Sequence, residues 1–112
     1  MKGQCHCGAV QIMVATAPAE VLRCNCSLCR KTGWRGGYWH PDAVAVEAER
    51  DALTPYVQGD RMITSWICKT CGCFTRWTPI TASPERMGVN MRMFEPEEWQ
   101  HLPVRDVDGA SF

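Results

Sequence analysis

The sequence predicts a mainly β fold in a single domain. Segments rich in β-branched and aromatic residues recur along the chain, and turn residues such as glycine, proline and aspartate separate them. No segment has the apolar spacing of a convincing amphipathic helix. The 112 residues suffice for one domain with a modest core, and eight cysteines can add to its stability. We therefore expect one β domain over residues 1–112.

The first half of the chain is expected to hold three strands. Pro18 should end the first of them, and the dipeptide Pro41-Asp42 should separate the other two. The segment CNCSLCRKTG, at residues 24–33, is expected to form a knuckle and a loop closed by Gly33. The three strands are expected at residues 8–17, 36–40 and 43–48.

The second half is expected to continue the β pattern. Residues 54–68 read as a hairpin that turns at residues 58–60, and Pro96 suits the first position of a single helical turn at residues 95–99. A loop is expected at residues 81–85 and an irregular tail from residue 102. Further strands are expected at residues 73–80 and 86–94, the latter with a helix as the alternative.

Charge and hydropathy argue against two classes of partner. Twelve basic and twelve acidic residues balance and are interspersed, whereas a nucleic-acid-binding domain usually has a basic surplus. No run approaches the ~18 consecutive apolar residues of a membrane span. The N-terminal segment shows no apolar signal core, so a reducing cytoplasm is the expected compartment. In that compartment clustered cysteines favour metal binding over disulfides.

The eight cysteines fall into three groups, and two of these combine into one predicted site. In extended chain, residues i and i+2 point to the same side, so a CxC can span one edge of a tetrahedral site. Gly8 and Gly72 each follow a cysteine and can adopt a positive φ that turns backbone N–H groups toward the sulfurs. We expect a structural site of four thiolates at Cys5, Cys7, Cys68 and Cys71.

The remaining cysteines leave a choice open. Cys24, Cys26 and Cys29 form a CxCxxC motif, and Cys73 is spare. Cys73 could complete a second closed site of four cysteines, or it could be a free thiol while the other three leave a coordination position open for chemistry. Spacing favours neither alternative.

Four motifs in order resemble one known family. GQCHCGAVQIMV, CNCSLCRKTG, WICKTCGC and GVNMRMFEP, spread over roughly residues 3–110, are similar to the glutathione-dependent formaldehyde-activating enzyme (GFA) family, which includes centromere protein V. The resemblance implies a β-tent fold of small antiparallel sheets that zinc holds together. It also implies a structural Zn²⁺ on Cys5, Cys7, Cys68 and Cys71, and a catalytic Zn²⁺ on Cys24, Cys26 and Cys29 with an exchangeable fourth position.

Two functional hypotheses follow. The resemblance implies a zinc-dependent carbon–sulfur lyase acting on adducts of a thiol and an aldehyde, such as S-hydroxymethylglutathione. The Zn²⁺ cofactor would hold a thiol as thiolate or polarise a carbonyl oxygen. The alternative is a non-enzymatic protein-binding module with two closed structural sites, and the position of Cys73 discriminates between them.

A few further residues carry weaker expectations. Arg30 and Lys31 could hold a carboxylate of the substrate, although a solvated loop is favoured. Trp34 is expected in the core or at its rim, with a wall of the second site as the alternative. Asn90 and Arg92 are expected on a solvated strand face.

Overall fold

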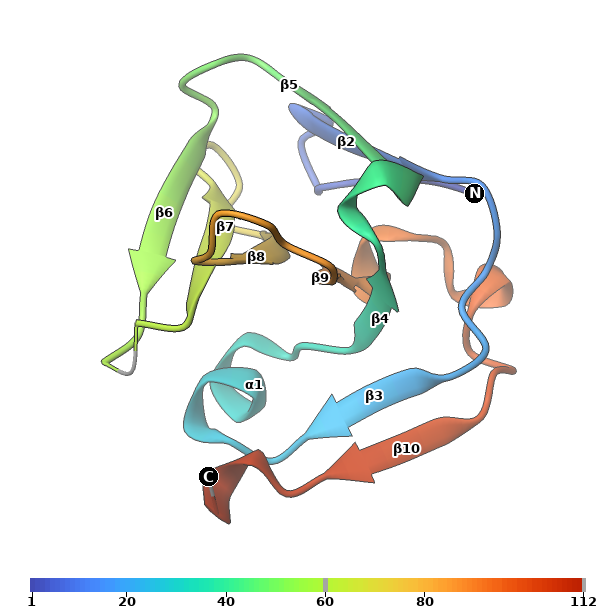
Figure 1. The fold of residues 1–112 in the computed structure, drawn as a ribbon. Coiled ribbons are helices and arrows are strands. Elements are labelled where there is room, and N and C mark those ends of the chain that lie inside the picture. Colours follow the sequence, from blue (N-terminus) through green and yellow to red (C-terminus); the bar gives the residue numbers. More distant parts are fainter. Residues whose placement is uncertain (60, 112) are drawn as a thin grey trace.

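The computed structural model describes residues 1–59 and 61–111, whose strands form two sheets (Figure 1). The smaller sheet has the order β1-β2-β5 and is antiparallel. Its strands are β1 (Lys2–Gln4), β2 (Val10–Val14) and β5 (Val44–Ala48). The larger sheet has the order β10-β3-β4-β9-β8-β7-β6. Its strands are β3 (Val21–Cys24), β4 (Gly36–Trp39), β6 (Leu53–Val57), β7 (Ile63–Cys68), β8 (Phe74–Pro79), β9 (Met87–Asn90) and β10 (Val104–Val107).

The main core lies between the two sheets. Apolar side chains alternate inward along β2, which explains why its Ile12 and Val14 are buried. They pack with residues of the larger sheet and of the segment after β9. The buried members of this cluster are Ile12, Val14, Val21, Met87, Val89, Met91 and Phe94. The mainly β fold predicted from the sequence is therefore confirmed.

Several predicted elements are confirmed with shifted ends. The strands expected in the first half appear as β2, β4 and β5, and the hairpin appears as β6 and β7. The expected turn at residues 58–60 is only partly testable, since Asp60 lies outside the described residues. Pro96 begins the single turn η3 (Pro96–Glu98), as expected. The segment 86–94 divides into β9 and the helical turn η2 (Met91–Met93), so each alternative holds for one half.

The CNCSLCRKTG segment, expected to form a knuckle and a loop, contains a short helix. Helix α1 (Ser27–Thr32) begins after Cys26, whose sulfur accepts a hydrogen bond from the Cys29 N–H, and ends at Gly33 with φ 73°. A six-residue helix held by its caps needs no apolar stripe, and none of its residues is buried. Periodicity therefore gave no sign of it.

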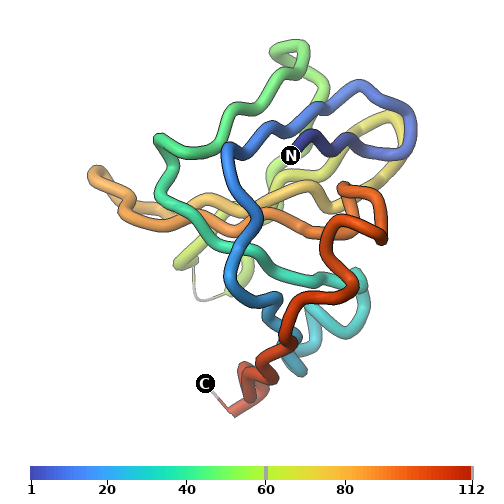
Figure 2. The backbone as a smooth tube through the Cα atoms, turned by 90° about the vertical axis from the view of Figure 1, so that its right-hand side faces the viewer, coloured from blue at the N-terminus to red at the C-terminus, as the bar shows by residue number. Residues whose placement is uncertain are grey.

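The tail expected to be irregular forms an ordered strand. β10 pairs in parallel with β3, from Val104 opposite Val21 to Val107 opposite Cys24. Two side-chain pairs cross this edge: Arg23 with Asp106 and Arg105 with Glu20. Most residues of β10 are exposed, so its sequence lacks the alternating apolar pattern that would have predicted a strand. Figure 2 shows the tail running beside the chain segment that precedes α1.

None of the helices among the described residues is long and apolar enough to cross a membrane.

Candidate metal centre and adjoining cavities

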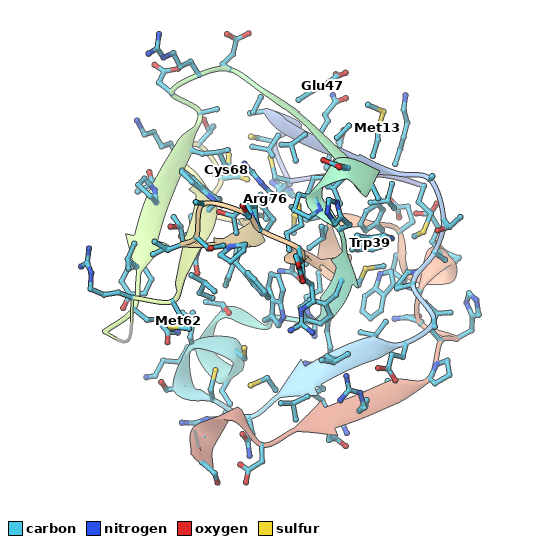
Figure 3. All side chains as sticks on the ribbon, viewed as in Figure 1. Met13, Trp39, Glu47, Met62, Cys68 and Arg76 are labelled. Carbon is cyan, nitrogen blue, oxygen red and sulfur yellow. The ribbon has the colours of Figure 1, made fainter. Side chains whose placement is uncertain are left out.

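The first cysteine cluster joins the start of the chain to the turn between β7 and β8. Its members are Cys5, Cys7, Cys68 and Cys71, whose sulfurs all lie within 4.8 Å of one another. The Sγ of Cys7 lies 3.6 Å from that of Cys5 and 3.7 Å from that of Cys68. Both distances approach the edge of roughly 3.8 Å expected for a tetrahedral zinc–thiolate site. Figure 3 shows Cys68 on β7, directed toward the N-terminal strands.

Two glycines shape the turns of this cluster. Gly8 has φ 83° and donates to the Cys5 carbonyl, while Gly72 has φ 79° and donates to the Cys68 carbonyl. The predicted positive φ at both positions is confirmed. These turns fold the chain back after each cysteine pair. After the first turn, the Val10 N–H donates to the Cys5 sulfur at 3.4 Å.

The donor set of the first cluster suits a cation. Burial opposes ionisation of Cys71, but hydrogen bonds from the backbone at Cys7 and Cys73 and from the Cys68 side chain lower its pKa to about 5. The Cys7 thiol accepts from the Ala9 backbone, but partial desolvation and the sulfurs of Cys5 and Cys68 raise its pKa to about 12. Neighbouring sulfurs therefore cannot all be thiolates unless a positive ion neutralises them. Four sulfurs in this arrangement fit a thiophilic ion such as Zn²⁺.

The second cluster is local in sequence. Cys24 ends β3, Cys26 caps α1 and Cys29 lies within α1, and their sulfurs are within 4.8 Å of one another. The backbone N–H of Cys26 lies 3.4 Å from the Cys24 sulfur, and that of Cys29 lies 3.4 Å from the Cys26 sulfur. The short helix therefore directs backbone donors at two of the three sulfurs.

The sulfurs of the second cluster also oppose one another's ionisation in the absence of a cation. Burial opposes ionisation of Cys26, but hydrogen bonds from the Cys29 backbone and side chain and from Cys24 outweigh it and hold its pKa below the usual range. Burial and the sulfurs of Cys26 and Cys24 raise the pKa of Cys29. The three sulfurs thus fit a metal ion for the same reason as the first cluster.

Cys73 lies with the first cluster. It packs, half-buried, against the apolar group formed by Cys5, Val10 and Cys68. Among the described residues no histidine, carboxylate or further cysteine joins Cys24, Cys26 and Cys29 within the same 4.8 Å limit. The second cluster therefore holds three sulfurs from the described part of the chain.

Two cavities border the second cluster. We name the first the aromatic cavity; its volume is about 720 Å³, and it reaches all three cysteines. Its aromatic lining consists of Trp34, Tyr38, Phe74 and Trp77. The second, the basic cavity, has a volume of about 640 Å³ and reaches Cys24 and Cys29. Its basic lining consists of Arg23, Arg30, Arg35 and Arg92.

The larger sheet lines much of the aromatic cavity. Lining residues come from β3, β4, β7, β8 and β10, with α1 on one side. Trp34 is 2% exposed, and its ring centroid lies 4.7 Å from that of Phe74. Its indole N–H donates to the Tyr38 hydroxyl at 3.4 Å. Trp34 is thus both a core residue and a wall of the second site, so both expectations for it hold.

Tyr38 presents a neutral hydroxyl to the aromatic cavity. Burial raises the pKa of Tyr38, and the Arg86 guanidinium lies over its ring, 4.5 Å from the centroid. A Cβ at Gly36 would overlap the Tyr38 hydroxyl and the Trp34 indole, so the glycine leaves room for both. The described residues include an N–H donor to the Tyr38 oxygen but no acceptor for its proton.

The C-terminal tail forms part of the wall. Asn25 donates from Nδ2 to Asp108 at 2.8 Å, and its Oδ1 accepts from the Ala110 N–H at 2.9 Å. A Cβ at Gly109 would overlap the Cys24 sulfur, so the tail backbone lies directly against the second cluster. No local pattern indicates this role of Asn25, because its partners are 83 and 85 residues away in the chain.

The expected solvated face at Asn90 and Arg92 is wrong for Asn90. Asn90 is 2% exposed; its Oδ1 accepts from the N–H groups of Arg35 and Arg92, and its Nδ2 donates to the Phe74 carbonyl. The Arg92 Nε donates to the Gly33 carbonyl at the end of α1. A buried amide that joins three segments cannot be told from an exposed one by sequence alternation alone.

Comparisons with known proteins agree with one another. The family model of the glutathione-dependent formaldehyde-activating enzyme matches residues 1–105. A Halomonas elongata protein named "Putative glutathione-dependent formaldehyde-activating enzyme" is 43% identical over 121 aligned positions, covering 95% of this chain and 76% of that protein. The crystal structure of a Rhodobacter sphaeroides protein superposes with a TM-score of 0.75 at 34% identity, over 94% of this chain and 100% of the other. From the order of its cysteine motifs, its fold and these matches, the chain belongs to the glutathione-dependent formaldehyde-activating enzyme family.

Proposed function

We propose that this protein is a zinc-dependent carbon–sulfur lyase that forms or cleaves the adduct of a glutathione-like thiol and an aldehyde, such as S-hydroxymethylglutathione. The carrying observation is the second cluster: three sulfurs, no fourth described ligand, and direct access to a cavity. The name of the Halomonas elongata relative supports the same substrate class.

The two clusters would have different roles. Cys5, Cys7, Cys68 and Cys71 would hold a structural Zn²⁺ that ties the N-terminal segment to β7. Cys24, Cys26 and Cys29 would hold the working ion and leave one coordination position toward the cavities. A Zn²⁺ ion there supplies a lowered pKa for a bound thiol and polarisation of an oxygen.

The chain's own residues would orient the reactants. In adduct formation the thiolate sulfur attacks the carbonyl carbon; the carbon–sulfur bond forms, and the carbonyl π pair moves to the oxygen, which takes up a proton. Tyr38 faces the cavity with a protonated hydroxyl and would donate to that oxygen. Trp34 and Phe74 would exclude water and hold the aldehyde carbon against the thiol. Cleavage is the same step reversed, so no oxidant is required.

The free thiols favour a reducing compartment. All eight cysteines are unpaired in the structure. We propose that residues 1–112 work as one GFA-type domain in a reducing compartment such as the cytoplasm, where these sulfurs stay available for metal.

The rival hypothesis of a closed, non-enzymatic module finds no support in the geometry. It required Cys73 at the second cluster, whereas Cys73 packs beside the first.

Exchange NMR between free glutathione and its formaldehyde adduct tests the proposal. Zinc-loaded protein should raise the exchange rate above the spontaneous rate, and Cys26→Ala should abolish the increase while one zinc per chain remains. An active Cys26→Ala protein, or a wild-type rate equal to the spontaneous one with formaldehyde and with larger aldehydes, would contradict it.

A further inference from the structure

The aromatic cavity is far larger than formaldehyde requires. Its volume is about 720 Å³. Formaldehyde has two non-hydrogen atoms and fills on the order of 60 Å³, about twice the share of a water molecule in the liquid. Cavities of roughly 300–1,000 Å³ are typical of sites for much larger organic molecules. A carbonyl compound bound in this cavity can therefore carry a bulky group on its carbon.

The lining of the cavity favours an apolar group. Leu22, Leu28 and Ile63 line it together with the four aromatic rings. Leu28, Ile63, Tyr38 and Trp77 are only partly buried, so the folded chain leaves some of their apolar surface exposed. None of the described lining residues is acidic. Removal of this apolar surface from water would contribute to the binding of an apolar group.

The aromatic rings are arranged so that their faces stay partly uncovered. Trp34 and Phe74 are tilted by 38° with their centroids 4.7 Å apart, and Tyr38 and Trp77 are tilted by 52° with their centroids 5.8 Å apart. A tilted pair covers less of each ring face than a parallel stack would. Because aromatic rings attract one another edge to face at centroid distances of roughly 4.5–7 Å, a further ring suits this lining.

Arg86 and Gly88 hold the rings of Tyr38 and Trp77 in position. The Arg86 guanidinium lies 4.5 Å from the Tyr38 centroid and 6.0 Å from the Trp77 centroid, so its charge is directed at these rings. A Cβ at Gly88 would overlap the Trp77 indole, so this indole lies directly against the backbone of β9. Rings that are already positioned bind a ligand at a lower entropic cost than mobile ones.

The cavity connects these rings with the sulfurs of the second cluster. The three cysteines line it from β3 and α1, whereas Trp77 lines it from β8. Figure 1 shows α1 and β3 apart from β7 and β8. A ligand that spans the cavity would therefore have its reacting carbon at the sulfurs and its substituent against Trp77.

We propose that the aromatic cavity binds the aromatic ring of the carbonyl substrate, so that the protein acts on adducts of a thiol with an aldehyde that carries such a ring, for example phenylacetaldehyde. This inference rests on the proposed function and replaces formaldehyde by a larger carbonyl partner. The thiolate sulfur bonds to the carbonyl carbon, the carbonyl π pair moves to the oxygen, and the oxygen takes up a proton. The ring packs against Trp77 and is unchanged by the reaction.

Binding of an unreactive alcohol tests the ring site without turnover. 2-Phenylethanol keeps the ring and the oxygen of phenylacetaldehyde, whereas 2-cyclohexylethanol has a saturated ring of similar size. NMR titration of the zinc-loaded full chain should show about two- to tenfold tighter binding of 2-phenylethanol, the range expected for aromatic pairs. Equal affinities, or no binding of either alcohol, would overturn the proposal.

The indole N–H signals of the tryptophans locate the bound ring. 2-Phenylethanol should shift the signals of Trp34 and Trp77 through its ring current, and 2-cyclohexylethanol should shift them much less. Trp66 and Trp99 do not line the cavity, so their signals are internal controls. If 2-phenylethanol shifts neither cavity indole, the ring binds elsewhere and the proposal is wrong. This measurement on the wild type does not depend on the folding of any variant.

Trp77→Leu and Trp66→Leu form a matched pair of variants. Both replace a partly buried tryptophan, on the adjacent strands β8 and β7, but only Trp77 lines the cavity. Trp77→Leu should lower the preference for 2-phenylethanol over 2-cyclohexylethanol at least about twofold, and Trp77→Phe should keep more of it. Trp66→Leu should retain the full preference. An unchanged preference in a folded Trp77→Leu protein would overturn the proposal.

Exchange NMR with glutathione separates failure of this inference from failure of the proposed function. The ratio of catalysed to spontaneous rate should be about two- to tenfold higher for phenylacetaldehyde than for cyclohexylacetaldehyde. Selective binding of 2-phenylethanol without catalysed exchange of any aldehyde keeps the ring site and overturns the lyase. Catalysed exchange of formaldehyde without selective binding of 2-phenylethanol keeps the lyase and overturns the ring site.

Discussion

The backbone N–H of Cys29 lies 3.4 Å from the sulfur of Cys26, so one side chain is both a candidate metal ligand and the N-cap of α1. The helix and the second cluster therefore both depend on the Cys26 sulfur. Gly33 ends the helix seven residues after Cys26, so α1 is short and its N-cap contributes much of what holds Cys29 in position.

Cys26→Ser and Cys26→Ala separate these two roles. The serine hydroxyl can still cap α1, but it is a poor ligand for a thiophilic ion. We expect both variants to bind one zinc per chain instead of two, and alanine to cost about 1 kcal/mol more in unfolding free energy than serine. Metal analysis and denaturant titration measure the two effects; equal stabilities would argue against the cap.

Cys7→Ser should test the first cluster. This substitution removes one of the four candidate ligands. It also removes the contact between Cys7 and Cys68, which are 61 residues apart in the chain. If this cross-link acts like other loop closures of that length, its loss costs about 4 kcal/mol and one bound zinc. Thermal unfolding and metal analysis check both.

Cys73→Ser is the matched control for that experiment. Cys73 packs beside the same cluster but is absent from the group of close sulfurs. We expect two zinc ions per chain and a small change in stability. Loss of the second metal in this variant would show that Cys73 closes that site after all.

Tyr38→Phe should slow the chemical step. Removing a proton donor to the reacting oxygen is expected to lower kcat about 10²-fold with little change in KM. Because the pKa of Tyr38 is raised, the wild-type hydroxyl stays protonated, and its contribution persists until the pH rises above the usual tyrosine range. Tyr56→Phe, on exposed β6, is the control, and an unchanged kcat in Tyr38→Phe would remove Tyr38 from the mechanism.

The tail wall should loosen on acidification. Hydrogen bonding to Arg23 lowers the pKa of Asp106, and hydrogen bonding to Ser111 and Asn25 lowers that of Asp108. Depressed carboxyl pKa values stabilise the docked tail above the ordinary value of 3.8, and this contribution is lost as the pH falls through the lower folded values.

Asp108→Asn at pH 7 isolates the same effect from acid-induced metal loss. The amide exchange of Ala110, measured by NMR, should become faster because the Asn25 side chain loses its charged partner. Asp51→Asn, an exposed change in the turn before β6, should leave it unaltered. Unchanged exchange in Asp108→Asn would mean that the tail is held by its strand pairing alone.

The predictable parts of the fold are those whose composition or alternation is typical of strands. In β2 buried and less buried side chains alternate, so the pattern of the sequence indicates a strand. The hairpin of β6 and β7 does not alternate in burial, but its β-branched and aromatic residues on either side of a turn indicated it. The cysteine spacing likewise grouped Cys5 and Cys7 with the pair 61 and more residues away, because a CxC and a CxxC each offer half a tetrahedron.

The parts that were not predictable depend on partners distant in sequence. β10 forms because β3 offers an unpaired edge and because oppositely charged side chains pair across it. The strands β1 and β3 were not predicted, since each is too short to show a period. The basic cavity gathers arginines from four segments, and no local pattern indicates that Arg23 and Arg92 line one space. Only Arg30, adjacent to Cys29, gave a signal in the sequence.

The two cysteine clusters differ in how they would assemble. The second lies within six consecutive residues, Cys24 to Cys29, so an unfolded or nascent chain can gather its three sulfurs at small entropic cost. The first requires Cys7 and Cys68 to meet across 61 residues, so its assembly has a larger loop-closure cost. During synthesis, the local cluster could therefore load metal while the sheets are still incomplete, and filling of the first cluster would report that folding has finished.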